Sequence, residues 1–302
     1  MGVSELSAFA ELVGPAAAGP VVAVGGRTQW DVGGQLTGPA REVRAPAGIV
    51  VHEPAEMTVR VRAGTPIDEL SHALAERGQR VSLPPWPDAT VGGLLAAGQS
   101  GVDRLGRGPL RDAALELRYV SADGDVVTAG GPTVKNVSGF DLVRLLVGSV
   151  GTLGLIGEAV LRTTPIPAVS HWFAVDDADP WQLLATLYRP CSLLWNGTTT
   201  WVLLEGNGGD VADQAAATGL AGREIDGPPP LPPHRWSLRP GELRELPADG
   251  HGPFVAELGV GVVHRTVPAP TRPLQPAVAA VTARLKHAFD PDGRLAPGRS
   301  VS

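Results

Sequence analysis

Glycine is concentrated in three short clusters in the first half of the chain, and these clusters restrict its fold more than any other feature. They are residues 25–34 (GGRTQWDVGG), 90–101 (TVGGLLAAGQSG) and 148–157 (GSVGTLGLIG). Because glycine has no Cβ, backbone N–H groups in such loops can approach an anion closely. A pyrophosphate group needs several such donors. Ordinary turns explain any single glycine pair equally well, so it is the repetition that favours phosphate binding.

The common nucleotide-binding motifs are absent from this sequence. No G-x-G-x-x-G pattern occurs, and no Gly-Lys pair exists that could form a Walker A loop. These absences argue against a Rossmann dinucleotide site and against an NTPase. Phosphate binding by the glycine clusters therefore requires a different architecture.

Composition narrows the class of protein further. A chain of 302 residues that is 43% hydrophobic can form one large or two medium domains with a substantial core. The formal net charge of −6 comes without a long basic run, which argues against nucleic acid as a partner. Cys191 is the single cysteine, so no disulfide framework or thiol metal cluster can form within the chain.

The chain shows no sign of membrane insertion or secretion. Its N-terminus lacks a basic segment followed by an apolar run. No apolar stretch approaches the ~20 residues of a membrane-spanning helix. We therefore expect a cytoplasmic protein without a membrane span.

Period-2 hydrophobic patterns and turn residues predict several strands in the first half. Strands are expected at residues 20–24, 48–53 and 56–63, and a final one at residues 154–164. A hairpin is expected at residues 115–129, because Asp123-Gly124 is a strong turn dipeptide between two strand-like runs.

Capping residues predict where the helices begin. Thr65 is expected to cap a helix with Pro66 in its first turn, and the pair Ser138 and Asp141 is expected to open a second helix at residues 142–147. A third helix is expected within residues 271–288. The apolar face of the first helix consists of Ile67, Leu70 and Leu74.

Four motifs, in this order along the chain, resemble those of the FAD-binding domain of the vanillyl-alcohol oxidase and p-cresol methylhydroxylase (PCMH) superfamily. Residues 25–28 (GGRT) after a strand resemble its pyrophosphate-binding loop, and residues 84–93 (PPWPDATVGG) resemble its second FAD segment. Residues 135–154, which contain KNVSGFDL and GSVGTLG, resemble a third segment, and residues 289–298 (FDPDGRLAPG) resemble the C-terminal motif. Within the superfamily, the short cap is most similar to the FAD-binding subunits of bacterial glycolate oxidase complexes.

The resemblance implies an α+β fold and a domain organisation. It implies a PCMH-type FAD-binding domain of two α/β subdomains at residues 1–167 and a reduced, small α+β cap domain at residues 168–270. Residues 271–302 would form a C-terminal helix and a tail that return to the first domain. Composition also shifts at residues 165–167, after which five of the seven tryptophans follow.

The resemblance also implies which residues contact non-covalently bound FAD. The first loop would bind the pyrophosphate, the second would lie along the cofactor, and the third would lie near its adenine and ribose. Lys135 and Asn136 would stabilise a loop near the flavin, and Trp30 would either flank the isoalloxazine or serve packing. The implied cofactor-binding residues are Gly25, Gly26, Arg27, Thr28, Thr90, Gly92, Gly93, Lys135, Asn136, Gly139, Asp141, Gly151, Thr152, Gly154 and Ile156.

The chain departs from the family pattern in three places. Many relatives attach the flavin covalently to a histidine of the first loop, but no histidine occurs between residues 21 and 51, so we expect non-covalent FAD. Ala296 replaces the asparagine of the C-terminal motif. The metal-binding H-x-G-D-G-N-x-H run of many 2-hydroxy-acid dehydrogenases is missing, and no histidine pair has ligand spacing, so no metal site is expected.

His264 and Arg265 are the candidate catalytic residues. Flavin oxidation of an alcohol needs a base for the hydroxyl proton and a cation for a substrate carboxylate. His264 suits the first role, and Arg265 suits the second. Neighbours on an extended strand face opposite ways, however, so both cannot easily point into one pocket. A surface or core-edge position for His264 is an equally good explanation of the sequence.

Three functional hypotheses follow. The first is an FAD-binding subunit of a glycolate oxidase-like complex that oxidises a small 2-hydroxy acid, together with a second flavoprotein and an iron–sulfur subunit. The second is a stand-alone FAD oxidase of another alcohol or an amine. The third is a non-catalytic module that retains the flavin fold and serves as a scaffold.

Overall fold

The computed structural model describes residues 2–131, 141–270 and 274–300, and its contacts divide the chain into two compact units. The first unit combines residues 1–100, 110–166 and 273–302, and the second combines residues 101–109 and 167–272. The mixed α+β architecture expected from the sequence is confirmed. Within the described residues, no helix has both the length and the apolar character that crossing a membrane requires.

The predicted division of the chain differs from these units in one segment. The prediction assigns residues 101–109 to the first domain, whereas the structure packs them with the second unit. The amide of Gly106 donates to the Cys191 carbonyl at 3.0 Å, and a Cβ on Gly106 would lie 2.6 Å from the Cα of Cys191. Because this backbone contact joins residues that are far apart in the sequence, it cannot be predicted from a local sequence pattern.

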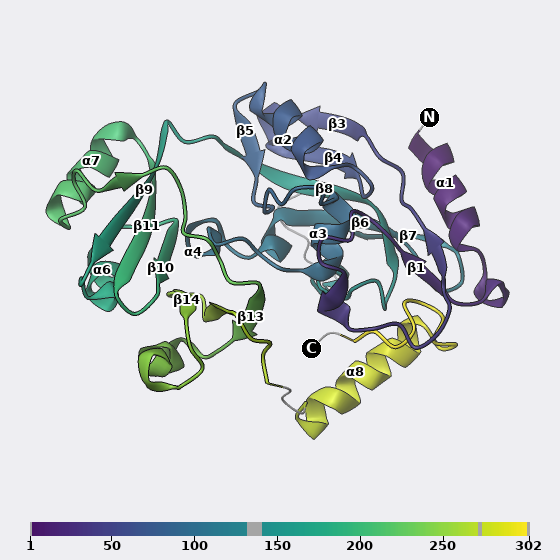
Figure 1. Cartoon of the computed structure of the whole chain (residues 1–302). Coiled ribbons are helices and arrows are strands. Elements are labelled where there is room, and N and C mark those ends of the chain that lie inside the picture. The colour runs from purple at the N-terminus through teal and green to yellow at the C-terminus, as the bar shows by residue number, and fades with distance from the viewer. Residues whose placement is uncertain (1, 132–140, 271–273, 301–302) are drawn as a thin grey trace. The chain divides into compact units, whose positions relative to one another are not determined.

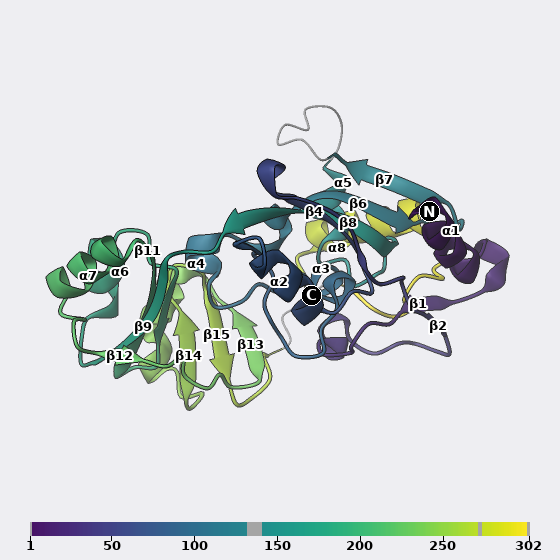
Figure 2. The same cartoon turned by 90° about the horizontal axis from the view of Figure 1, so that it is seen from above.

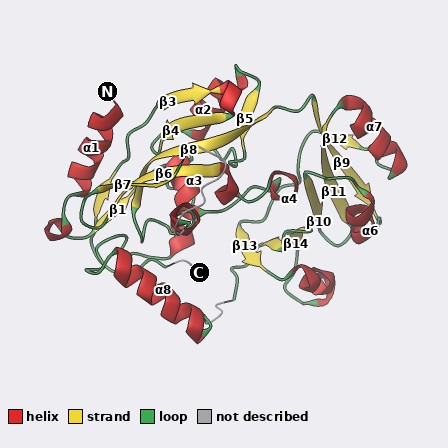
Figure 3. Ribbon diagram, turned by 180° about the vertical axis from the view of Figure 1, so that it is seen from behind, coloured by secondary structure: helices red, strands yellow, loops and turns green. Residues whose placement is uncertain are grey.

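A six-stranded antiparallel sheet forms the centre of the first unit (Figures 1 and 3). Its central strand is the predicted final strand. Residues 155–161 of this strand are all buried, because strands pair with it along both edges and helices pack on the sheet. The predicted hairpin at Asp123-Gly124 is confirmed, with Gly124 at a φ of +87°. In spatial order the strands are β3 (Ile49–Glu53), β4 (Thr58–Arg62), β8 (Leu155–Pro165), β6 (Ala114–Val120) and β7 (Val126–Gly130), and β5 (Gln79–Val81) also pairs with β8.

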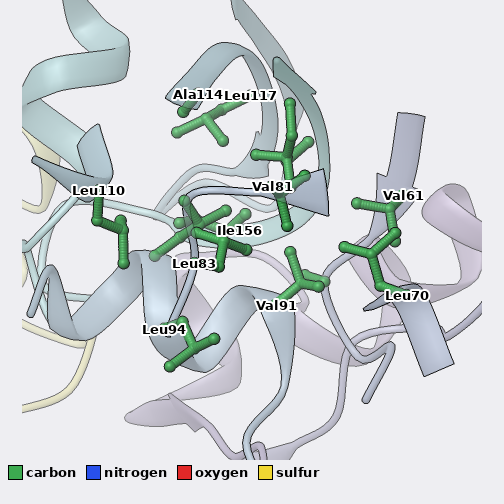
Figure 4. Close-up of a cluster of buried hydrophobic side chains, with 14 of the residues drawn as sticks. Val61, Leu70, Val81, Leu83, Val91, Leu94, Leu110, Ala114, Leu117 and Ile156 are labelled. Carbon is green, nitrogen blue, oxygen red and sulfur yellow. The ribbon is translucent and has the colours of Figure 1, made fainter. Parts of the chain in front are cut away.

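Three helices cover this sheet and form the main hydrophobic core of the first unit with it (Figure 4). The predicted apolar face of the first of them is confirmed, because Ile67, Leu70 and Leu74 are all buried. Burying a leucine or isoleucine side chain stabilises a fold by about 1.5–3 kcal/mol, so this helix is held mainly by its packing. The helices are α2 (Ile67–Ala75), α3 (Val91–Ala97) and α5 (Leu142–Leu146).

A tertiary contact changes the first of the two predicted helix starts, whereas the second is confirmed. Thr65 does not cap α2: its hydroxyl accepts from the amide of Gly48 at 2.9 Å and donates to the carbonyl of the same residue at 3.3 Å. The helix therefore begins at Ile67, with Pro66 in the N-cap position and no side-chain cap. Asp141 does cap α5, accepting from the amide of Arg144 at 3.0 Å, whereas Ser138 lies outside the described residues.

The C-terminal tail returns to the start of the first unit, beside the parallel strands β1 (Val21–Ala23) and β2 (Arg41–Val43). The amide of Val21 donates to the Arg294 carbonyl, and the amide of Ala296 donates to the Val21 carbonyl, both at 2.9 Å. The tail thus lies along β1 on a small second layer that includes helix α1 (Gly2–Val13). It follows helix α8 (Pro276–Phe289), the observed form of the predicted C-terminal helix.

The second unit is built on a seven-stranded antiparallel sheet, whose strands lie side by side in Figure 2. Apolar side chains of α6, α7 and the 3₁₀ turns at Pro240–Ala248 bury one of its faces. The short helix α4 (Arg104–Arg107) packs against β10, the middle strand. In spatial order the strands are β12 (Glu224–Ile225), β9 (Val169–Asp176), β11 (Thr199–Gly206), β10 (Ser192–Trp195), β14 (Phe254–Glu257), β15 (Val262–Arg265) and β13 (His234–Ser237), and the two long helices are α6 (Pro180–Thr186) and α7 (Gly208–Ala217).

Candidate functional site

The first glycine loop lies directly against the segment that leads into α3. A Cβ on Gly25 would lie 2.3 Å from Oγ1 of Thr90, and a Cβ on Gly26 would lie 1.6 Å from the Asp88 carbonyl oxygen. No side chain fits at either position, so both glycines are required by the contact between the two loops. Arg27 follows with a φ of 60°, a left-handed conformation that is unusual for a residue with a side chain.

This packing leaves a row of backbone donors open to solvent. The amides on either side of the row are used, since Val24 N donates to Val43 O at 2.9 Å and Trp30 N donates to Arg27 O at 3.3 Å. In the part of the chain that the structure describes, none of the N–H groups of residues 25–29 between them has a protein acceptor. Consecutive unpaired amides in a turn form an anion-binding concavity.

These amides belong to a pocket contained entirely in the first unit. Two guanidinium groups, of Arg27 and Arg299, line it, and no carboxylate does. The pocket therefore has the donors and the positive charge that a phosphate group needs. Its lining residues are Ala23, Gly25, Gly26, Arg27, Thr28, Gln29, Trp30, Thr90, Gly93, Ala96, Ala97, Val150, Gly151 and Arg299.

The third glycine cluster reaches this pocket through the end of α3. A Cβ on Gly98 would lie 2.6 Å from the Cα of Gly148, and the amide of Val150 donates to the Ala96 carbonyl at 2.8 Å. Val150 and Gly151 are both left-handed, with φ of 47° and 77°. A β-branched residue rarely adopts this conformation, and such strain is typical of binding sites.

Seven of the predicted cofactor-binding residues line the pocket and are thus brought together by the structure: Gly25, Gly26, Arg27, Thr28, Thr90, Gly93 and Gly151. The structure places the others in supporting positions or does not describe them. Lys135, Asn136 and Gly139 lie outside the described residues, and Asp141 caps α5. Contact of any of these residues with the cofactor stays a prediction.

The remaining four predicted residues pack the loops against the sheet. A Cβ on Gly92 would lie 2.6 Å from the Cβ of Ala63, and one on Gly154 would lie 2.4 Å from the ring of Tyr119. The hydroxyl of Thr152 donates to the Ser149 carbonyl at 2.7 Å, and Ile156 is buried in the main core. These contacts hold the loops in place, and direct contact with adenine or ribose stays a prediction.

In the second unit, His264 is buried and paired with a carboxylate. Its Nε2 lies 2.8 Å from Oε1 of Glu257, and the two side chains are 6% and 1% exposed. Arg235 stands directly opposite His264 on the neighbouring strand, with its Nη2 at 3.8 Å from the same carboxylate oxygen. Burial lowers the pKa of Arg235, which nearby Glu257 opposes and nearby Arg104 reinforces.

Arg265 faces the other side of the same strand, so the structure does not bring it together with His264. Its guanidinium is fully buried, pairs with the Asp249 carboxylate and donates to the Gly252 carbonyl at 3.0 Å. It also lies over the Trp236 ring, with its Cζ 4.8 Å from the centroid. The cation that shares a face with His264 is Arg235, which sequence reasoning missed because only the pairing of β13 with β15 reveals it.

Neither Cys191 nor the metal-ligand side chains of the described residues form a second candidate site. Burial and the neighbouring Glu205 carboxylate raise the pKa of the Cys191 thiol to about 12, so the thiolate nucleophile is suppressed at neutral pH. Across residues 2–131, 141–270 and 274–300, no three histidine, cysteine or carboxylate side chains are grouped so that they could hold a metal ion.

The loop architecture and the pocket define a class of protein. Residues 7–130 match a family model described as an FAD binding domain. This part of the chain is a PCMH-type FAD-binding domain, and its cofactor is FAD. The pocket fits this cofactor, because open amides and two guanidinium groups without a carboxylate suit its pyrophosphate.

Two curated proteins are similar to this chain. Over 220 residues the chain is 34% identical to glycolate oxidase subunit GlcE of Escherichia coli (strain K12). This alignment covers 69% of this chain and 61% of the GlcE chain. Over 106 residues it is 43% identical to a D-lactate dehydrogenase of Archaeoglobus fulgidus. This second alignment covers 34% of this chain and 24% of the dehydrogenase. The chain thus spans about 61% of the length of the first relative and less of the second.

A solved structure supports the fold. The structure of an alkyldihydroxyacetonephosphate synthase superposes with a TM-score of 0.68 at 14% identity, covering 97% of this chain and 73% of that one. At this identity the likeness concerns the fold alone.

Proposed function

We propose that this protein is the FAD-binding subunit of a glycolate oxidase-like complex and that it oxidises a small 2-hydroxy acid. The observation that carries the proposal is the row of open amides at residues 25–29 beside two guanidinium groups, in a chain that is 34% identical to a glycolate oxidase subunit. The relatives named for glycolate and D-lactate share 2-hydroxy-acid substrates, which supports this substrate class.

In this proposal the first unit holds FAD without a covalent bond. The amides of residues 25–29 bind the pyrophosphate, and the hydroxyls of Thr28 and Thr90 add donors at the same pocket. No histidine stands between residues 21 and 51 to attach to the flavin. Bound FAD supplies the two-electron acceptor for a substrate hydride.

His264 serves as the base for the substrate hydroxyl in this proposal. When its Nε2–H donates to the Glu257 carboxylate, Nδ1 carries the lone pair and can accept a proton. Glu257 fixes the ring orientation and stabilises the protonated ring. The assignment of Arg265 to the substrate carboxylate stays a prediction, and it requires the guanidinium to exchange its contact with Asp249 for the substrate.

The test is anaerobic reduction of the purified, flavin-loaded chain. Bleaching of the visible flavin absorption band by glycolate or D-lactate is expected. Bleaching only by other alcohols or by amines would support the stand-alone oxidase instead, and a protein that no donor reduces, alone or with its partner subunits, would support the scaffold. His264→Ala should abolish bleaching by the productive donor without releasing FAD, whereas His287→Ala, at an exposed histidine of α8, should not affect it.

Partners and location also belong to the proposal. The similar proteins are named as subunits, which supports assembly into a larger complex. We propose a second flavoprotein and an iron–sulfur subunit as partners, in the cytoplasm. Affinity purification of the tagged chain from its native cells should recover a flavoprotein and a cysteine-rich protein in fixed ratio.

A further inference from the structure

We propose that Arg299 in the C-terminal tail binds the pyrophosphate of FAD directly and is the main charged ligand of that group. None of the glycine motifs includes this residue. The inference rests on the FAD site of the proposed function, but not on the reaction that the flavin serves.

Backbone hydrogen bonds fix the position of the tail at the pocket. The amide of Thr37 donates to the Pro297 carbonyl at 3.0 Å, and the amide of Ser300 donates to the Gly33 carbonyl at 3.1 Å. The amide of Arg299 itself donates to the Ala296 carbonyl at 3.1 Å. Arg299 is therefore held on both sides in sequence, beside the loop that carries the open amides.

Its guanidinium is oriented but only partly satisfied. Nη2 donates to the Trp30 carbonyl at 2.9 Å, and Cζ lies 3.8 Å from the centroid of the Trp30 ring. Nε is buried and has no acceptor among the described residues. Several other arginine Nε atoms among the described residues share this state, so what distinguishes Arg299 is that its side chain lines the pocket.

Among the described residues, no carboxylate forms an ion pair with the Arg299 guanidinium. Burial lowers the pKa of Arg299, nearby Asp31 opposes this effect, and nearby Arg27 reinforces it. Arg27 differs, because its guanidinium forms an ion pair with Glu42 at 2.5 Å and is about half exposed. Of the two cations that line the pocket, Arg299 is thus the one whose charge calls for an anionic ligand.

A pyrophosphate matches these requirements. Its oxygens accept from guanidinium N–H groups in parallel, and the planar fork of arginine suits this contact better than a lysine ammonium does. The open amides of residues 25–29 supply neutral donors to the same anion. Two phosphate charges would also relieve the repulsion between Arg27 and Arg299.

The experiment measures FAD affinity and its salt dependence for the full chain. Stripped protein is titrated with FAD, following flavin fluorescence, at several ionic strengths. Losing a charge-assisted hydrogen bond weakens binding by about ten- to hundredfold, so Arg299→Leu should raise the Kd by that factor. The salt dependence of the Kd should also become shallower. Arg299→Lys should fall between the two proteins, because it keeps the charge but loses the fork.

Arg284→Leu, at an exposed arginine of α8, is the matched control and should bind FAD as the wild type does. Circular dichroism and the Tm of each apoprotein report whether the tail stays folded. An Arg299→Leu protein with wild-type Kd would overturn the inference. A raised Kd with unchanged salt dependence would also overturn it, because Arg299 would then act by supporting Trp30. If FAD binds as expected but no hydroxy acid reduces it, the proposed function fails and this inference stands.

Discussion

Arg294 provides the sharpest test of how the C-terminal tail is held. Its side chain is 3% exposed and donates to four backbone carbonyls. The acceptors and donor–acceptor distances are Gly19 at 3.0 Å, Gly14 at 2.9 Å, Ala122 at 2.6 Å and Val13 at 2.7 Å. These carbonyls come from the end of α1, the following turn and the end of the central sheet, so one guanidinium joins three separate segments.

Arg294→Met should destabilise the first unit by about 2–3 kcal/mol. Leaving one buried carbonyl without its donor costs about 1 kcal/mol at the low end of the usual range. Three carbonyls are left in this way, because the carbonyl of Val13 also accepts from Nη2 of Arg41 at 2.9 Å. Removing a buried charge returns part of that cost, because the desolvation of the guanidinium is no longer needed. Arg294→Lys keeps the charge but has a compact head that cannot reach all four carbonyls, so it should lose about half as much.

Urea denaturation measures this loss. Circular dichroism follows the whole chain, and release of FAD reports the first unit. The slope with urea should stay unchanged while the midpoint of the first unit falls. Arg284→Met, at an exposed position, should change stability by less than about 0.5 kcal/mol. A loss below about 1 kcal/mol in Arg294→Met, or an equal loss in the control, would refute the reasoning.

Three further predictions concern other parts of the chain. Gly26→Ala should weaken FAD binding at least about tenfold while the circular dichroism spectrum stays normal, because the new Cβ would lie 1.6 Å from the Asp88 carbonyl oxygen and would separate the two loops. The control is Gly38→Ala, whose new Cβ would meet nothing within 4 Å. Equal Kd values for the two variants would contradict this account. The Cys191 thiol should react with a disulfide reagent at pH 8 about a thousandfold more slowly in the native protein than in urea. The reason is that burial and Glu205 raise its pKa from 9.0 to about 12, so the reactive thiolate is rarer in the native protein. Comparable rates in the two conditions would show that the thiol is not shielded. Asp179→Ala should lower the stability of the second unit by about 1 kcal/mol in thermal denaturation, because the Asp179 carboxylate caps α6 by accepting from the amide of Trp181 at 2.9 Å. An unchanged Tm would mean that the cap contributes nothing to stability.

Local features of the fold could be predicted from the sequence because they depend on neighbouring residues. The hairpin at Asp123-Gly124 needs only a turn dipeptide between two strand-like runs, and it forms as predicted. The apolar face of α2 follows from helical spacing alone. The cap of α2 could not be predicted, because the hydroxyl of Thr65 finds a partner in Gly48, seventeen positions earlier in the chain.

The candidate site was predictable to the extent that glycines mark it. Gly25 and Gly26 stand out in the sequence, and the structure gives the reason in their contact with Thr90 and Asp88. Arg299 could not be found in this way, because its position depends on the tail lying beside β1. The position of Arg235 opposite His264 likewise follows from strand pairing, which no residue spacing encodes.

The three-part assembly of the first unit has a consequence for biosynthesis. The glycine loops and the sheet leave the ribosome first, but the tail that holds Arg294 and Arg299 is translated only after the entire second unit. Domains usually begin to fold as they emerge. Here the cofactor pocket cannot be completed early in translation, so we expect flavin loading to be a late event in maturation. A ribosome that stops before residue 294 releases a chain with all three glycine loops and an incomplete pocket.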